Sequence, residues 1–96
     1  MVFCHFFCFC LYTINIETTG RYDIKVWASS AATDKYINIY MNGELIGSPD
    51  VYTENWYDYV LYDVGEIDLA RGINVMKLEF AEGDVNAAAF EINQIG

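Results

Sequence analysis

Short runs in which apolar and polar residues alternate recur along most of the chain. The clearest run places Tyr22, Ile24, Val26 and Ala28 on one face and polar residues on the other. Alternation with a period of two predicts half-buried β-strands, because successive side chains of a strand point to opposite faces. Strands are predicted at residues 11–17, 22–28, 36–41, 44–46, 56–64, 73–80 and 89–95, and no run has a helical period.

Turn residues separate these runs at short intervals. Asn42-Gly43 predicts a tight hairpin, because both residues tolerate a positive φ. Many short strands joined by such turns predict an all-β domain, an antiparallel β-sandwich of the jelly-roll kind. A chain of 96 residues has room for one such core and not for two.

The first ten residues differ from the rest. Residues 1–16 contain no Asp, Glu, Lys or Arg, and the segment begins MVFCHFFCFCL. It lacks the positive start and small-residue cleavage site of a secretory signal, and it is too short to span a bilayer. Cys4, His5, Cys8 and Cys10 do not form the two spaced ligand pairs of a usual zinc site, so no metal is predicted. The domain is therefore assigned to residues 11–96, and the sequence leaves open whether residues 1–10 belong to it.

Acidic residues outnumber basic ones by 14 to 5, which gives a formal net charge of −9. This charge repels nucleic-acid phosphates and anionic lipid, so we expect neither nucleic acid nor membrane as a partner. The only histidine, His5, has no acid within its own segment, so no catalytic triad is indicated. Fourteen acids place some pair close together by chance, and a carboxylate pair carries no weight as a glycosidase signal. We expect no enzymatic activity.

Aromatic residues that lie on polar strand faces or in loops are the best candidates for ligand contacts. Trp27 shares a strand face with Asp23 and Lys25, and Trp56 follows the loop residues Thr53-Glu54-Asn55. A flat ring among polar neighbours suits a sugar, which has apolar C–H faces and hydroxyls that need hydrogen bonds. For Trp27, packing between the two sheets is the favoured interpretation. For Trp56, packing and ligand contact are equally well supported by the residues alone.

Several motifs, taken in order, resemble a carbohydrate-binding module of the family 6/35 type, a galactose-binding-like jelly roll. They are YTINI at 12–16, GRYDIKVWAS at 20–29, INIYMNG at 37–43, TENWYDY at 53–59, LARGIN at 69–74, LEF at 78–80 and NAAAFEI at 86–92. The resemblance covers residues 11–96 and rests on the ordered set.

The resemblance implies a non-catalytic glycan-binding module, an accessory domain of a secreted polysaccharide-degrading enzyme, and hence an extracellular protein. It assigns sugar stacking to Trp56 and hydrogen bonding of sugar hydroxyls to Asn86. The structural calcium common in the family is not expected, because the family's N-terminal acid has no counterpart and Ala88 stands where a second acid would be. The alternative is a structural or interaction β-domain, a spacer or adhesin-like unit that binds no sugar.

The family's opening strands have no counterpart in the sequence, and their loss would expose a sheet edge. Unpaired N–H and C=O groups on such an edge favour self-association. Residues 3–11 are apolar and uncharged, so they either extend the strand at 12–16 or lie outside the fold. Both alternatives predict poor solubility.

Overall fold

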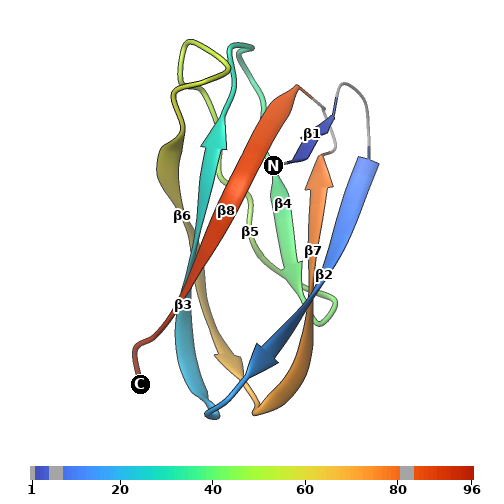
Figure 1. The fold of residues 1–96 in the computed structure, drawn as a ribbon, viewed down its shortest axis with the longest axis vertical. Helices are drawn as coiled ribbons and strands as arrows, with labels where there is room; N and C mark the ends of the chain where they lie inside the picture. Colours follow the sequence, from blue (N-terminus) through green and yellow to red (C-terminus); the bar gives the residue numbers. More distant parts are fainter. Residues whose placement is uncertain (1, 5–7, 81–83) are drawn as a thin grey trace.

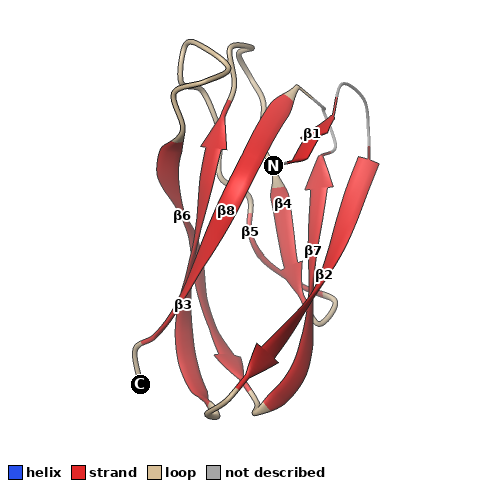
Figure 2. Ribbon diagram, viewed as in Figure 1, coloured by secondary structure: helices blue, strands red, loops and turns tan. Residues whose placement is uncertain are grey.

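The computed structural model describes residues 2–4, 8–80 and 84–96, which form eight β-strands and no helix (Figures 1 and 2). The strands are β1 (Val2–Cys4), β2 (Cys8–Ile16), β3 (Gly20–Ser29), β4 (Asn38–Met41), β5 (Glu44–Gly47), β6 (Val60–Leu69), β7 (Gly72–Phe80) and β8 (Val85–Gln94).

The strands form two four-stranded sheets, in the orders β1-β8-β3-β6 and β2-β7-β4-β5. Every strand pair is antiparallel. The two sheets face each other along the long axis of the molecule (Figure 1). The predicted antiparallel β-sandwich is therefore confirmed.

The core lies between the sheets and is built from the inward positions of the alternating strands. On β3, Tyr22, Ile24, Val26 and Ala28 are all buried, as their alternation predicted. The opposite sheet contributes Ile39, Met41, Met76, Leu78 and Phe80, and Ile16, Ile37, Val51, Ile67, Leu69, Val85 and Ala87 complete the cluster.

Strand boundaries are where the sequence prediction departs from the structure. Residues 53–59, expected to lie partly in a strand, form a loop, and β6 begins only at Val60 and continues to Leu69. The Asn55 side chain explains the difference. Its Oδ1 accepts hydrogen bonds from the amides of Tyr57 and Asp58 at 2.8 and 2.7 Å. Such local bonds compete with sheet pairing and favour a turn.

The N-terminal segment takes part in both sheets. Residues 8–10 continue the strand predicted at 11–17, so that β2 runs unbroken from Cys8 to Ile16 against β7. Residues 2–4 pair with the start of β8. His5, Phe6 and Phe7, on which the metal and solubility arguments partly depended, lie outside the described residues.

Glycines allow a tight turn in the β4–β5 hairpin and a close approach of two strands beside it. Asn42 and Gly43 have φ values of 53° and 86°, which confirms the predicted hairpin turn. At the end of the same hairpin, β5 lies against β6 of the other sheet. A Cβ on Gly47 would clash with the carbonyl oxygen of Val64, and one on Gly65 would lie 2.6 Å from that of Ile46. Only glycine permits this approach.

We expect Gly47→Ala to lower the free energy of unfolding by about 1–3 kcal/mol, the usual cost of overpacking. The added methyl group meets backbone, which cannot rotate away as a side chain can. Urea titration followed by fluorescence measures the change. Leu45→Ala, at an exposed position of the same strand, is the control and should change the value by less than about 0.5 kcal/mol. Equal stability of the two variants would contradict the close contact.

Candidate functional site

One loop, residues 53–59, lies over the ends of β3 and β8 and brings the two predicted site residues together. The carbonyl oxygen of Trp56 accepts a hydrogen bond from Asn86 Nδ2 at 3.2 Å and from Ser29 Oγ at 2.8 Å. Asn86 is in the second position of β8 and Ser29 is the last residue of β3. Trp56 and Asn86, 30 residues apart in sequence, are therefore joined through the Trp56 backbone, and the Trp56 residue itself is half-buried.

A second set of hydrogen bonds fixes the start of the loop. Thr53 N donates to the carbonyl oxygen of Ser30 at 2.9 Å, and Ser30 N donates to Thr53 Oγ1 at 3.1 Å. Ser30 Oγ donates in turn to the carbonyl oxygen of Asp84 at 2.7 Å. Ser29 and Ser30 are fully buried. The start of the loop therefore rests on a base of buried hydroxyls at the end of β3.

Sequence reasoning missed this base of Ser29, Ser30 and Thr53. The available signal was the pair of serines that ends the alternating run of β3, where further apolar residues would have extended the core. A buried hydroxyl requires a partner, so two buried serines at a strand end indicate a loop packed on that end.

Asn86 is the most distinctive polar group at this end of the sandwich. The residue is only 7% exposed, and its Oδ1 has no hydrogen-bond partner among the described residues. An unmade hydrogen bond at a buried acceptor costs about 1–3 kcal/mol. Oδ1 has less than 1 Å² of accessible surface, so a hydroxyl donor from a bound molecule would relieve that cost only after the groups that cover Oδ1 shift.

Tyr57, which the sequence analysis did not select, is the most exposed large apolar side chain in the described part of the chain. It is 86% exposed, although its amide is held by Asn55. A side chain on a fixed backbone loses little entropy when it binds. The ring of Tyr57 is thus presented to solvent next to Trp56.

Trp27 lies on the outer face of its sheet, so the interpretation that it packs between the sheets is wrong. Its neighbours Val26 and Ala28 take the inward positions, and alternation turns Trp27 outward. There Trp27 Nε1 donates to Glu91 Oε2 of the adjacent strand β8 at 3.0 Å. Trp27 lies two residues before Ser29, which contacts the 53–59 loop. The indole of Trp27 itself, however, is bonded to β8.

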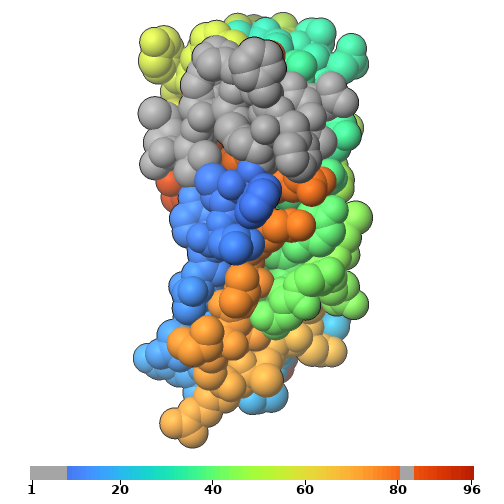
Figure 3. All heavy atoms as spheres, turned by 90° about the vertical axis from the view of Figure 1, so that its right-hand side faces the viewer, coloured from blue at the N-terminus to red at the C-terminus, as the bar shows by residue number. Residues whose placement is uncertain are grey.

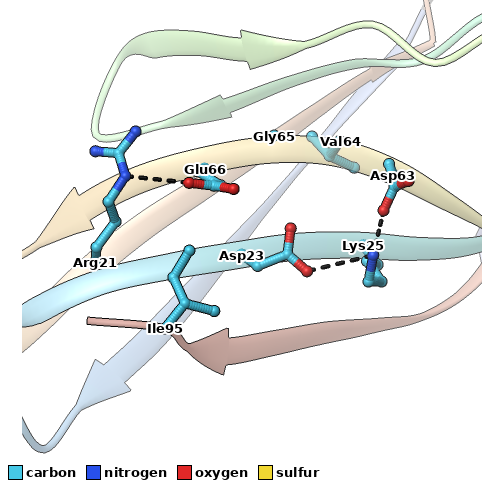
Figure 4. A pocket seen from close by; sticks show the side chains of 8 residues that line it. All are labelled: Arg21, Asp23, Lys25, Asp63, Val64, Gly65, Glu66 and Ile95. Carbon is cyan, nitrogen blue, oxygen red and sulfur yellow. Dashed lines mark hydrogen bonds and ion pairs between the residues drawn. The ribbon is translucent and has the colours of Figure 1, made fainter.

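A hollow of about 670 Å³ lies on the same outer face and is lined mainly by charged residues (Figure 4). Arg21 Nε lies 3.2 Å from Glu66 Oε1, and Lys25 contacts both Asp63 and Asp23. The hydrogen bond to Glu66 is the main cause of the raised pKa of Arg21. The pKa of Lys25 is raised first by Asp63 and then by Asp23. Each charged side chain that lines the hollow is therefore paired with another one.

Neither a metal centre nor a membrane helix is found in the described ranges. Across residues 2–4, 8–80 and 84–96, no three His, Cys, Asp or Glu side chains are grouped so that they would hold a metal ion. In the same ranges no helix is long and apolar enough to cross a membrane.

Solved structures with the same fold include carbohydrate-binding modules. The C-terminal family 6 module of the laminarinase LamC from Zobellia galactanivorans has a TM-score of 0.79 and 19% identity, over 95% of this chain and 76% of that one. A family 35 module from an environmental isolate has a TM-score of 0.77 and 19% identity, over 93% and 67%. The chain therefore has the family 6/35 fold that the motifs predicted.

A third similar structure is a whole enzyme, the GH26-CBM35 β-(1,4)-mannanase of Podospora anserina. Its TM-score is 0.79 with 16% identity, over 92% of this chain but only 19% of that one. The chain thus spans less than a fifth of this enzyme. No protein-family model matches the sequence, and no curated protein does.

We expect Asn86→Asp to destabilise the fold by about 1–3 kcal/mol at neutral pH, because a carboxylate oxygen would replace the amide donor that faces the Trp56 carbonyl. The loop should also exchange its amide hydrogens faster, as measured by mass spectrometry. Asn93→Asp, exposed on the same strand, introduces the same charge and should leave both measurements unchanged. Unchanged exchange in Asn86→Asp would separate Asn86 from the loop.

Proposed function

We propose that the chain is a non-catalytic glycan-binding module in which Trp56, Tyr57 and Asn86 make the sugar contacts. The observation that carries the proposal is the junction of Trp56 and Asn86, where an aromatic residue adjoins a buried amide with an unused acceptor. Sugars require both kinds of group, an apolar surface for the C–H face and an acceptor for a hydroxyl.

Each residue has a separate task in this proposal. Asn86 Oδ1 accepts a hydrogen bond from a sugar hydroxyl once the groups that cover it shift, while its Nδ2 stays bound to the loop. The indole of Trp56 and the exposed ring of Tyr57 supply apolar surface on the loop. Because Asn55 and Thr53 hold the loop in place, binding requires little ordering of the backbone.

The fold supports an accessory role beside a polysaccharide-degrading catalytic domain, and hence an extracellular one. Family 6 and family 35 modules with this fold include one from a laminarinase and one joined to a β-(1,4)-mannanase. Laminarin and β-1,4-mannan are therefore the first ligands to test, within an array of soluble and insoluble polysaccharides.

Trp56→Ala and Tyr57→Ala should each weaken binding of the glycan selected by the array about tenfold or more, since a truncated aromatic hot spot costs about 2 kcal/mol. Isothermal titration calorimetry measures the affinity, and thermal unfolding verifies the fold. Tyr40→Ala is the matched control, because Tyr40 lies on the other sheet beneath Lys77 Nζ, 4.4 Å from the ring centroid. An affinity that is unchanged in both loop variants would remove the loop from the site.

No reducing ends should be released when the purified chain is incubated with the glycans that it binds. The residues proposed to contact the sugar, Trp56, Tyr57 and Asn86, include no carboxylate that could act as the acid or the nucleophile of glycoside hydrolysis. A reducing-sugar assay over a day measures release. Activity that persists in a pure sample and is lost on substitution of one Asp or Glu would overturn the non-catalytic assignment.

A further inference from the structure

The end strand β2 has a complete row of backbone groups without a partner among the described residues. β2 is the first strand in the order β2-β7-β4-β5, and all nine of its residues pair with β7 on one side only. The pairing has no register shift, so the free side of β2 is regular over its whole length. Such an edge is a template for another strand.

The other end strands carry features that discourage such pairing. β1 has three residues, and β5 has four, with a register shift against β4. β6 has a register shift against β3 and carries the exposed acids Asp63, Glu66 and Asp68. By contrast, residues 8–16 contain neither a charged residue nor a proline. β2 is therefore the long end strand that has no charge, proline or register shift to discourage pairing.

The core is also incomplete beside β2, where the two sheets meet at the side of the sandwich opposite to the β5–β6 contact. Tyr12 points inward, with its ring centroid 6.2 Å from that of Phe90 on β8, yet it is 36% exposed. Cys10, Ile14 and Ile92 are likewise only partly buried, whereas Ile24 and Leu78, on inner strands, are fully buried. Apolar surface is therefore available next to the free edge.

The outer surface next to the edge is apolar as well. Phe9 and Leu11 are 55% and 60% exposed on β2, and Ile73 and Val75 are 67% and 41% exposed on β7. Figure 3 shows β2 in blue along this face, beside β7 in orange. In a chain with a net charge of −9, two identical copies repel each other over most of their surfaces. The strip at β2 is the part where they can approach without facing like charges.

We propose that β2 pairs with β2 of a second copy, antiparallel and about a two-fold axis, with Tyr12 opposite Tyr12 of the second copy. The β2-β7-β4-β5 sheet of one copy and the same sheet of the second copy then join into one continuous sheet. In this register every inward residue lies opposite an inward residue, so the two Tyr12 rings meet on the axis and cover the open side of both cores. Leu11 lies opposite Thr13 of the second copy, on the outer face.

The pairing does not depend on the proposed glycan binding and leaves it possible. The loop that contains Trp56 is on the far side of the sandwich from β2 (Figure 1). Each dimer would present two sites, so that binding to a polymer with repeating ligands would gain from avidity.

Sedimentation velocity of the full chain tests the assembly. We expect a species of twice the 11.0 kDa chain mass, with a dissociation constant of about 10 µM or lower. A chain that remains monomeric at concentrations above this dissociation constant would overturn the proposal. A monomer that binds a synthetic peptide with the sequence of residues 8–16 would assign the edge to a strand of another chain, and would equally overturn the dimer.

Charge substitutions test the register. Leu11→Lys combined with Thr13→Lys places like charges directly opposite each other twice, and should raise the dissociation constant at least tenfold. Leu11→Glu combined with Thr13→Glu should do the same, and an equal mixture of the two variants should restore a dimer. Ile73→Lys combined with Val75→Lys is the matched control, with the same charge and spacing on β7, and should remain dimeric.

Circular dichroism melting verifies that these variants fold, and all four positions are exposed. A dimer that survives the Leu11 and Thr13 lysine pair would place the interface elsewhere and overturn the proposal. A mixture of the lysine and glutamate variants that stays monomeric would also overturn it, because complementary charges in this register must attract.

Discussion

The two sheets of this protein meet backbone to backbone where β5 lies against β6, and the rest of the arrangement follows from that contact. Gly47 and Gly65 lack the Cβ atoms that would hold the strands apart. The chain leaves the hairpin at Gly47 and returns to the other sheet at Val60, so the intervening loop must pass over the end of the sandwich. The close contact of β5 and β6 therefore sets where this connection begins and where it returns to the sandwich.

At that end, main-chain groups organise the loop. The carbonyl of Trp56 receives one hydrogen bond from β3 and one from β8, two neighbouring strands of the same sheet. Fixing the backbone in this way holds the exposed ring of Tyr57 in a defined place on the loop. The same arrangement makes Asn86 both a support of the loop and a candidate ligand contact, so its removal affects stability and binding together.

The sequence predicted the parts of the structure that depend on a regular pattern. Alternation identified the buried face of β3, and Asn42-Gly43 identified a hairpin, because strand geometry and turn geometry are local properties. The start of β6 could not be found in this way, since the side-chain bonds of Asn55 override the strand propensity of the aromatic residues that follow.

The alternation of apolar and polar residues also did not predict which aromatic side chains are exposed. Trp27 and Tyr57 are both aromatic residues with polar neighbours, yet the first is bonded to Glu91 and the second is open to solvent. The ordered motifs selected Trp56 and Asn86 together, and the structure joins them.

The order of strands has a consequence for how the chain folds during synthesis. β8 lies between β1 and β3, and β2 pairs with β7, so most strand neighbours are distant in sequence. Among the described strands, only β4 and β5 follow each other directly in sequence and are also neighbours in a sheet. Long loops must close before these pairs form, which slows folding. Until β8 is synthesised, one side of β3 lacks its partner, and that open edge can pair with strands of neighbouring chains.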